Sequence, residues 1–556
     1  MTVVAAINNI IGKLVVCDPD SRNVVSDLLS FSVEGAENVN AFQIGVWNGK
    51  KTFLRPDDSF EAGFIEMIRR GLRERGIPLT VKDYRPTVEI KAEASRLTGI
   101  QMRDYQIEAC KAFLDNIRGV LRLATGSGKT ECAIWITAYL GIPTLFLTHK
   151  IDLVKQTAER FEKRLGRKVG WISEGEWMPG DITIASVQTI RSHWDLWWRV
   201  EGATQAYAGA PLKQAGKTVQ AANQADAIEI AKSQGLVEVH KINLVRDDSQ
   251  KVEQFLRSRQ LVICDEAHRV SGNTFFRIMK GCLEATYRLG LTATPLMKES
   301  REDNLKLIAA CGDIVYTITN KQLIDLGVLA QPKFRFFEAP MPPLVRRTTA
   351  YQRAYNLGIV RNDIRNAMVI DQAIELKDHK PIVLVQREEH GQILKLMAER
   401  RGAKVLWISG TTGKGKQKAA MRRQALDALR DGKVDFLIAS TIFDEGLDEA
   451  SIGAIILAGG NKSAISLYQR VGRGSRLKQC GRAQEAIIVD FIDVGNEHLR
   501  RHADERFKTV KEEEGWIVQE VDAWHENKRS PLLAPYAGML NPVGVFPELA
   551  KFTGSE

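Results

Sequence analysis

The sequence predicts an α/β protein in which two domains built on parallel sheets follow one another behind a small α+β domain. Apolar strand-like runs alternate with amphipathic helical segments from about Gly119 onward, and the alternation restarts after Pro381. Such runs indicate parallel strands whose two faces are both covered by helices. The chain shows no short-period repeat, which excludes solenoids and propellers.

Each of the two α/β domains is recognised by its own set of strand-like runs. They are GVLRLA, PTLFLTH, DITIAS, LVICDEAH and YRLGLTATP in the first, and PIVLVQ, AKVLWIS, DFLIAS, GAIILAG and EAIIVDFID in the second. Prolines in EAPMPP, residues 338–343, break the pattern and predict the joint. We therefore expect the first α/β domain over residues 98–337 and the second over residues 344–510. No fold is assigned to the tail, residues 511–556.

Two further regions stand apart from this pattern. Residues 1–97 read as a small α+β domain, with a strand at Lys13–Cys17 and helices near residues 18–31 and 61–76. An insert at about residues 199–260 separates two expected sheet strands by more than a normal loop. Within it, AANQADAIEIAKSQG predicts a helix ended by glycine, and LVEVHKINLV predicts a strand.

Composition limits the classes of function. The 556 residues suffice for about three domains, and the net charge of +10 weakly favours a polyanionic partner. The seven cysteines are scattered without a CxxC pair, which indicates a reducing compartment and no zinc site. The N-terminus lacks the features of a signal peptide, and no window is apolar enough to span a bilayer, so we expect no membrane partner.

The segment ATGSGKT follows a strand and opens a helix, which is the context of a phosphate-binding loop. Its glycines allow backbone N–H groups to approach phosphate, Lys129 brings a positive charge, and the Thr130 hydroxyl can bind Mg²⁺. Strict Walker spacing requires glycine where Leu123 stands, so the loop is a variant; a chance glycine turn is the alternative. The loop residues expected at the nucleotide are Thr125, Gly126, Ser127 and Gly128.

The segment DEAH ends the strand LVIC. Asp265 is expected to hold Mg²⁺ through water, and Glu266 to orient and deprotonate the attacking water. His268 is a candidate for coupling hydrolysis to motion. The alternatives are a solvated strand end for the acids and a core-edge histidine without a catalytic role.

The segment QRVGRGSR places Arg473 and Arg476 three residues apart in the second α/β domain. Arginines that reach a transferring phosphoryl group stabilise its charge, and this requires the second domain to close onto the first. The alternative is an exposed basic helix face.

Taken in order, ATGSGKT, DEAH, LTATP, STIFDEGLDEA and QRVGRGSR resemble motifs I, II, III, V and VI of superfamily-two helicases. The set extends from about Arg103 to Asp493, and RLGLTATP is especially similar to the phage UvsW, RecG and XPB-like branch. The resemblance implies two RecA-like domains that bind ATP between them. The N-terminal FQIGVWNGKKTF resembles the small first domain of UvsW-like helicases, whereas the insert departs from the family pattern.

The resemblance also implies roles for individual residues. Arg103 and Gln106 lie in a segment similar to the adenine-reading motif, Gly446 and Asp448 would meet the ribose, and Gln469 would join the arginines in motif VI. Thr292 and Thr294 would link ATP state to nucleic acid. Nucleic-acid backbone contacts are implied for Thr148, His149, Lys150, Ser186, Gln188, Thr189 and Thr441. For these hydroxyls the alternative is strand-end capping.

The tryptophan-rich segment SHWDLWW allows two interpretations. Trp194, Trp197 and Trp198 would suit base stacking. Helical packing into a local core explains them as well, and we favour packing.

These observations predict an ATP-dependent DNA helicase or translocase that uses ATP and Mg²⁺. The resemblance implies remodelling of branched or forked DNA without sequence preference, in the cytoplasm of a bacterium or a phage-infected cell. Single-stranded-DNA-binding or recombination proteins are expected as partners. An RNA helicase and the motor subunit of a restriction-type complex remain alternatives. A non-enzymatic clamp is disfavoured because Lys129, Asp265 and Glu266 are all present.

Overall fold

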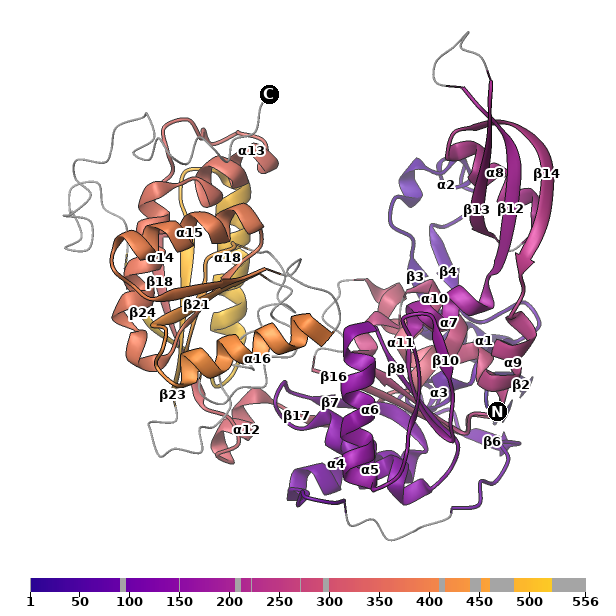
Figure 1. Cartoon of the computed structure of the whole chain (residues 1–556). Coiled ribbons are helices and arrows are strands. Elements are labelled where there is room, and N and C mark those ends of the chain that lie inside the picture. Colours follow the sequence, from indigo (N-terminus) through magenta and orange to yellow (C-terminus); the bar gives the residue numbers. More distant parts are fainter. Residues whose placement is uncertain are drawn as a thin grey trace. The chain divides into compact units, whose positions relative to one another are not determined.

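The chain folds into two compact units, each described here by itself (Figure 1). The first comprises residues 1–123 and 128–317, and the second comprises residues 124–127 and the chain from residue 318 onward. The computed structural model describes residues 2–90, 97–149, 151–205, 212–221, 223–270, 272–293, 300–409, 416–440, 452–460 and 485–522.

The first unit begins with a small α+β module. Its elements are β1 (Val3–Ile7), β2 (Ile11–Val16), α1 (Pro19–Leu28), β3 (Ser30–Ser32), α2 (Asn40–Gln43), β4 (Lys50–Thr52), β5 (Ser59–Glu61), α3 (Ile65–Arg73) and β6 (Leu79–Asp83). The main sheet has the order β5-β2-β1-β6, and β3 pairs with β4. Asp18 caps α1 by accepting a hydrogen bond from Ser21 N at 2.9 Å. The strand and both helices expected from the sequence are therefore confirmed.

This N-terminal module shares a hydrophobic core with the α/β domain that follows. Leu305 and Ala309 of α11 (Arg301–Cys311) pack among the module's buried side chains, which include Phe60 and Phe64. At Gly63 an added Cβ would overlap the backbone oxygen of Ile308. The module and α11 therefore pack too closely to separate without exposing apolar surface.

A mainly parallel sheet forms the centre of the first unit, in the order β10-β9-β11-β8-β15-β16-β7-β17. Its strands are β7 (Arg118–Leu123), β8 (Thr144–Thr148), β9 (Gly170–Ser173), β10 (Glu176–Met178), β11 (Ile182–Ser186), β15 (Leu261–Asp265), β16 (Tyr287–Thr292) and β17 (Ile314–Ile318). The helices around it are α4 (Asp104–Asn116), α5 (Lys129–Leu140), α6 (Ile151–Leu165), α7 (Val187–Trp194), α9 (Ser249–Arg257), α10 (Asn273–Gly281) and α11. Strands β7, β8, β11, β15 and β16 pair in parallel, as their apolar runs predict.

The insert folds as a separate element of the first unit. Its parts are β12 (Leu196–Thr204), β13 (Lys213–Ala221), α8 (Gln224–Ser233) and β14 (Leu236–Arg246). The antiparallel sheet β13-β12-β14 carries α8 on one face, where Val200, Val219 and Leu236 pack with alanines of the helix. Figure 1 shows these strands and α8 standing away from the main sheet. The predicted helix and strand are confirmed, and the insert has its own small core.

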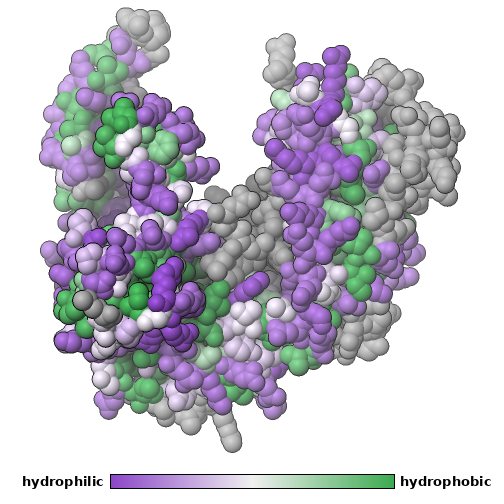
Figure 2. Space-filling view, turned by 180° about the vertical axis from the view of Figure 1, so that it is seen from behind, coloured by the Kyte–Doolittle hydropathy of each residue, from purple (hydrophilic) through white to green (hydrophobic). Residues whose placement is uncertain are grey.

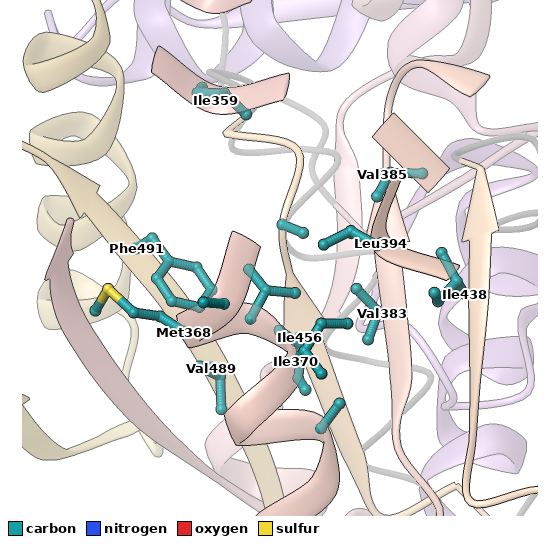
Figure 3. Close-up of a cluster of buried hydrophobic side chains, with 14 of the residues drawn as sticks. Ile359, Met368, Ile370, Val383, Val385, Leu394, Ile438, Ile456, Val489 and Phe491 are labelled. Atoms are coloured by element: carbon teal, nitrogen blue, oxygen red, sulfur yellow. The ribbon is translucent and has the colours of Figure 1, made fainter. Parts of the chain in front are cut away.

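The second unit is built on a parallel sheet with the order β20-β21-β19-β22-β23-β18-β24. Its strands are β18 (Gln331–Ala339), β19 (Ile382–Val385), β20 (Val405–Ile408), β21 (Phe436–Ser440), β22 (Ala454–Leu457), β23 (Glu485–Asp493) and β24 (Ile517–Asp522). The described helices are α12 (Asn320–Asp325), α13 (Tyr351–Tyr355), α14 (Asp363–Glu375), α15 (Glu388–Arg400), α16 (Lys416–Arg430) and α18 (Glu497–Glu512). Buried side chains cover both faces of the sheet, and Figure 3 shows one of these cores around Ile456 and Val489.

Short helical turns complete the described elements. They are η1 (Ala36–Asn38), η2 (Ala62–Phe64), η3 (Ala267–Arg269), η4 (Asn356–Val360) and η5 (Lys377–His379). Within the described residues, no helix is both long and apolar enough to cross a bilayer.

Two boundaries expected from the sequence differ from the structure. The sequence pattern places β18 in the first α/β domain, yet this strand pairs in parallel with β23 along its whole length and belongs to the second sheet. Strand β24 lies in the tail to which no fold was assigned, and it pairs with the other side of β18. The prolines of residues 340–343 therefore follow the first strand of the second sheet in chain order instead of preceding the domain.

Candidate nucleotide and nucleic-acid site

Three of the predicted motifs lie at the same edge of the first sheet. The glycine loop follows the carboxyl end of β7, Asp265 is the last residue of β15, and Thr292 is the last residue of β16. Strand β16 lies between the other two and pairs in parallel with both. Carboxyl ends of parallel strands meet at one edge, where α/β proteins bind ligands.

The glycine loop leads directly into the N-terminus of α5. Gly126 and Gly128 both have φ of +89°, a left-handed conformation that glycine adopts without strain. At Gly128 an added Cβ would also overlap the side-chain amide of Gln106. Because α5 begins at Lys129, its first N–H groups are free of intrahelical partners and can face an anion.

Gln106 joins the segment before α4 to this loop. Its side chain is 2% exposed, and its Oε1 accepts a hydrogen bond from Arg103 N at 2.9 Å. The same amide is the group that an added Cβ at Gly128 would meet. The structure thus brings Arg103, Gln106 and the loop together, and the role of Gln106 at adenine remains a prediction.

A buried carboxylate supports the start of α5, and the sequence motifs gave no sign of it. Glu131 is 3% exposed and lies 2.9 Å from Arg160 and 3.2 Å from Arg164, both on α6. Arg164 also donates to the backbone oxygens of Thr98 and Gly99. This network fixes the helix that carries Lys129 and Thr130 against α6 and against the chain leading to Arg103.

The DEAH segment turns sharply after β15. Glu266 has φ of +51° and ψ of +54°, which is left-handed and unfavourable for a residue with a Cβ. The turn leaves Asp265 and Glu266 partly exposed at the sheet edge, whereas His268 is buried. Backbone strain of this kind clusters at functional sites.

His268 connects the DEAH segment to the end of β16. Its Nδ1 lies 3.1 Å from Thr292 Oγ1 and 3.4 Å from Glu266 Oε2. Thr292 is fully buried, so its hydroxyl faces the histidine and not solvent. A movement of Glu266 would therefore be transmitted to Thr292, at the end of β16, through the side chain of His268.

The segments expected to contact a nucleic-acid backbone are neighbours as well. β8 and β11 pair in parallel, with Thr148 opposite Ser186. Ser186 caps α7 by accepting from Thr189 N at 3.1 Å, and its hydroxyl lies 2.7 Å from the buried Thr189 hydroxyl. The capping interpretation thus explains these two hydroxyls.

The surface side chains of the same segments are His149 and Gln188. Gln188 is exposed, and its Nε2 lies 3.3 Å from His149 Nδ1. Together they present polar groups at the carboxyl ends of β8 and β11, and β8 is the neighbour of β15 in the sheet.

The tryptophans are used in packing, but not on one helix. Trp194 ends α7, whereas Trp197 and Trp198 lie on β12. Trp194 stacks against Arg277 at 4.3 Å, Trp197 donates to Ser192 O at 2.8 Å, and Trp198 packs on the core of the insert. The helical spacing assumed from the sequence was wrong because the chain changes from helix to strand at Leu196.

Two family models match the chain, one in each of its two α/β domains. "Type III restriction enzyme, res subunit" matches residues 99–297, and "Helicase conserved C-terminal domain" matches residues 365–478. The first match contains the glycine loop, DEAH and Thr292, and the second contains QRVGRGSR. The chain is a superfamily-two helicase.

Relatives of known name can be aligned with most of the helicase sequence. It is 24% identical to the DNA 3'-5' translocase XPB2 of Sulfurisphaera tokodaii, over 72% of this chain and 83% of the relative. It is 24% identical to the DNA 3'-5' helicase XPB of Mycobacterium tuberculosis, over 76% of this chain and 66% of the relative. Among solved structures it is similar to T4 UvsW, with a TM-score of 0.40 and 17% identity, covering 94% of this chain and 100% of that chain.

Several predicted site residues of the helicase lie outside the described residues. They are Lys150, Thr294, Thr441, Gly446, Asp448, Gln469, Arg473 and Arg476. Their roles stay predictions that rest on the sequence.

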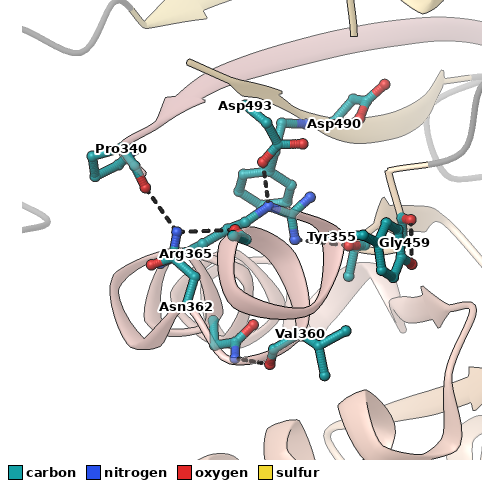
Figure 4. Close-up of polar contacts among 12 residues, drawn as sticks. Pro340, Tyr355, Val360, Asn362, Arg365, Gly459, Asp490 and Asp493 are labelled. Carbon is teal, nitrogen blue, oxygen red and sulfur yellow. Dashed lines mark hydrogen bonds and ion pairs between the residues drawn. The ribbon is translucent and has the colours of Figure 1, made fainter. Parts of the chain in front are cut away.

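A buried ion pair holds the chain that leads toward motif VI of the helicase (Figure 4). Arg365 on α14 is fully buried and its Nε lies 2.7 Å from Asp493 Oδ1. Arg365 also donates to Ala458 O at 2.7 Å, and Tyr355 donates to Gly459 O at 2.8 Å. Arg365 and Tyr355 therefore hold the two residues that follow β22, Ala458 and Gly459. The sequence analysis did not predict this role for either side chain.

Proposed function

We propose that this helicase is an ATP-driven DNA translocase that remodels branched DNA. The observation that carries the proposal is the meeting of the glycine loop, DEAH and Thr292 at the carboxyl edge of one parallel sheet. The choice of DNA is supported by the names of the translocase XPB2 and the helicase XPB, which match most of this chain. The net charge of +10 agrees with a polyanionic track.

The residues at this edge suit ATP with Mg²⁺. The backbone N–H groups between Gly126 and the start of α5 would hold phosphate oxygens, and Lys129 would neutralise their charge. Thr130 and Asp265 would hold the metal, which supplies charge neutralisation when bound. The left-handed backbone at Glu266 sets the carboxylate just beyond the strand end, where it would orient water.

Closure by the second domain would complete the reaction. We propose that Arg473 and Arg476 stabilise the charge on the transferring phosphoryl group, with Gln469 beside them. Gly446 and Asp448 would meet the ribose. Arg365 and Tyr355 support the proposed role of the arginines. They hold the backbone at Ala458 and Gly459, shortly before QRVGRGSR begins.

The nucleic acid would pass over the carboxyl ends of β8 and β11. We propose that His149 and Gln188 make the contacts there, since their side chains reach the surface while Ser186 and Thr189 pair with each other. Contacts of this kind address the backbone of one strand and carry no sequence information. His268 and Thr292 would transmit the state of Glu266 to the neighbouring strand.

The N-terminal module is the proposed reader of DNA branches. Its tip around α2 exposes Phe42 by 40%, Ile44 by 67% and Val46 by 78%, and the exposed Lys50 and Lys51 follow on β4. Apolar side chains beside lysines suit a place where base pairs open, since bases meet the apolar groups and phosphates meet the charges. The molecular face in Figure 2 is mostly hydrophilic, with small separate hydrophobic patches.

A motor for a restriction-type complex is the second candidate. It is favoured by the family model named for a restriction enzyme subunit, which matches residues 99–297. Such a motor would depend on a partner that cuts DNA. An RNA helicase is the third, and it differs in the polymer that stimulates hydrolysis.

One ATPase assay separates these functions. Turnover would be compared with single-stranded, duplex, forked and four-way DNA and with RNA of equal length. Forked or four-way DNA is expected to stimulate several-fold more than linear duplex, and RNA little. Equal stimulation by linear and branched DNA would favour the restriction-type motor, and strongest stimulation by RNA would overturn the choice of DNA.

A further inference from the structure

A polar cavity of about 530 Å³ lies in the first unit where the N-terminal module meets the α/β domain. Its lining comes from both parts; the charged residues are Glu66, Arg69, Asp83, Arg85, Arg118 and Asp313, and Asn116 lies among the polar ones. Arg118 begins β7, whereas the glycine loop follows Leu123 at the other end of the same strand. At about 3.3 Å per residue, the cavity lies roughly 17 Å from the nucleotide loop.

The acidic groups of the cavity already have arginine partners. The pairs are Arg69–Glu66 at 3.2 Å, Arg85–Asp83 at 2.5 Å and Arg70–Asp313 at 2.6 Å. Each carboxylate is therefore within ion-pair distance of an arginine other than Arg118. Because Asp313 pairs with Arg70, which does not line the cavity, Arg118 is the lining guanidinium that lies outside these three pairs.

Arg118 is that guanidinium, and it is short of partners. It is 8% exposed, and its Nη2 donates to Asn9 O at 2.6 Å. Its Nε is buried and has no hydrogen-bond partner among the described residues, and no ion pair formed between described residues includes Arg118. Asp83 acts on Arg118 electrostatically, but no carboxylate of the described residues forms a direct ion pair with it, and a buried charge without a direct partner is unfavourable.

The neighbouring Arg288 shows what a purely structural arginine looks like here. It is 2% exposed and donates to the backbone oxygens of Ala285, Met279 and Cys282, so its guanidinium is well satisfied. Within the described part of the chain Arg118 has one such acceptor, and it opens onto the cavity. Burial, together with the charges of Arg288 and Arg85, lowers the pKa of Arg118 well below its ordinary value.

We propose that this cavity binds a phosphate group, held mainly by the guanidinium of Arg118 with Arg69 and Asn116 beside it. An oxyanion supplies the direct ionic partner that Arg118 lacks among the described residues, and the planar fork of arginine suits two phosphate oxygens at once. The site goes beyond the motor function, because it lies at the opposite end of β7 from the nucleotide loop. A ligand there would bind both the module and the α/β domain and hold them together.

The group can come from free phosphate or from a phosphorylated small molecule. The volume exceeds that of a bare ion, so a phosphate monoester fits as well. Sodium phosphate and ribose 5-phosphate are therefore both used as probes, and the tighter binder identifies the source.

Calorimetric titration of the 556-residue chain tests the site. A non-hydrolysable ATP analogue with Mg²⁺ is first added to saturation, so that the glycine loop is occupied; this step by itself reports on the nucleotide site. Phosphate is then titrated at constant ionic strength into the wild type and into Arg118→Gln, which removes the charge but can still donate to Asn9 O. Arg73→Gln is the matched control, because Arg73 is exposed on α3 and does not line the cavity.

Saturable phosphate binding is expected in the wild type and in Arg73→Gln, and at least tenfold weaker binding in Arg118→Gln. Absence of saturable binding in the wild type, or equal affinity in Arg118→Gln, would overturn the proposal. If Arg118→Gln does not fold, Arg69→Gln decides, since that side chain is 47% exposed and dispensable for the core. A threefold or larger loss of affinity supports the site, and unchanged affinity rejects it.

Discussion

At the scale of single residues, the backbone of the candidate site departs from regular conformations at Gly126, Gly128 and Glu266. For the two glycines a left-handed backbone is without strain, but for Glu266 it costs on the order of 1–2 kcal/mol. Strand β15 and the turn Ala267–Arg269 hold the glutamate in place on both sides. The fold thus offsets local strain at the residue proposed to orient water.

Lys129→Ala is expected to abolish ATP hydrolysis without changing the fold. The side chain is partly exposed at the start of α5, so its loss removes a phosphate-facing charge and no core volume. Steady-state ATPase and circular dichroism check this, with the exposed Lys111→Ala on α4 as the control. Near-normal turnover in a folded Lys129→Ala protein would remove the nucleotide assignment.

Gly128→Ala is expected to destabilise the first unit more than Gly166→Ala does. Both positions are left-handed, which costs alanine about 1–2 kcal/mol, but the new methyl group at residue 128 also meets the amide of Gln106. Apart from residues 165–167 themselves, no atom of the described residues lies within 4 Å of the methyl group at residue 166. Urea denaturation of the two variants measures the difference, and equal losses would mean that Gln106 moves aside without cost.

At the scale of elements, α14 and α15 are joined by a histidine that is neutral in the folded protein at physiological pH. His390 is fully buried, and its Nε2 lies 2.9 Å from Asn366 Oδ1. Burial, with the nearby charge of Arg365, lowers the pKa of His390 from 6.5 to about 3. The unfolded chain therefore binds this proton as the pH falls through about 6.5, whereas the folded chain does not until about pH 3.

The stability of the second unit should consequently fall below pH 6.5 by up to about 1.4 kcal/mol per pH unit from this group. His390→Gln, which retains a donor for Asn366, should flatten that dependence between pH 6.5 and 4.5 even if it lowers stability at neutral pH. Urea denaturation at several pH values measures the slope. The same slope in wild type and variant would show that His390 takes up its proton without unfolding.

The insert is the second element with a testable role, and its structure decides how to remove it. Trp197 and Arg246 are paired neighbours on β12 and β14, so a short Gly/Ser linker can replace residues 198–245. Cutting inside the strands would instead expose Val200 and its core. The hypothesis is that the insert contacts DNA, because Arg199 and Lys241 lie on the sheet face opposite α8.

Removing the insert should preserve ATPase without DNA and weaken DNA binding. The slope of the logarithm of the DNA-binding constant against the logarithm of the salt concentration should fall in magnitude by about 2, because roughly two phosphates are no longer neutralised. Fluorescence anisotropy at several salt concentrations measures both quantities. Unchanged affinity and slope in a folded variant would make the insert a tolerated surface excursion.

At the scale of the whole molecule, the N-terminal module cannot be treated as a removable part. Its core includes Leu305 and Ala309 of α11, and Arg70 pairs with Asp313 at 2.6 Å. Deletion of residues 1–97 would therefore expose apolar surface of the α/β domain and confuse loss of stability with loss of recognition. Substitutions at the exposed tip are the better test.

Changing Phe42, Ile44 and Val46 together to serine should reduce the preference for forked over linear DNA by about fivefold, equivalent to about 1 kcal/mol. ATPase without DNA should not change, because the tip is exposed and lies outside the shared core. Competition binding between forked and linear DNA measures the preference. An unchanged ratio in the triple variant would show that branches are read elsewhere.

The sequence by itself determined the two parallel sheets and the residues of the nucleotide motifs. Period and spacing are local properties: an apolar strand run and a glycine turn before a helix can be read from ten neighbouring residues. The same holds for the helix of the insert, AANQADAIEIAKSQG, which became α8.

Only the tertiary structure decided which strands share a sheet and which polar groups meet. β18 precedes the prolines yet pairs with β23, and β24 joins it from the tail, because strand pairing is set by contacts between distant parts of the chain. Glu131 with its arginines, the contact of His268 with Thr292, and the unsatisfied Arg118 have no local signature. Each depends on the burial and distance of side chains that the sequence keeps apart, and burial is what makes their charges matter.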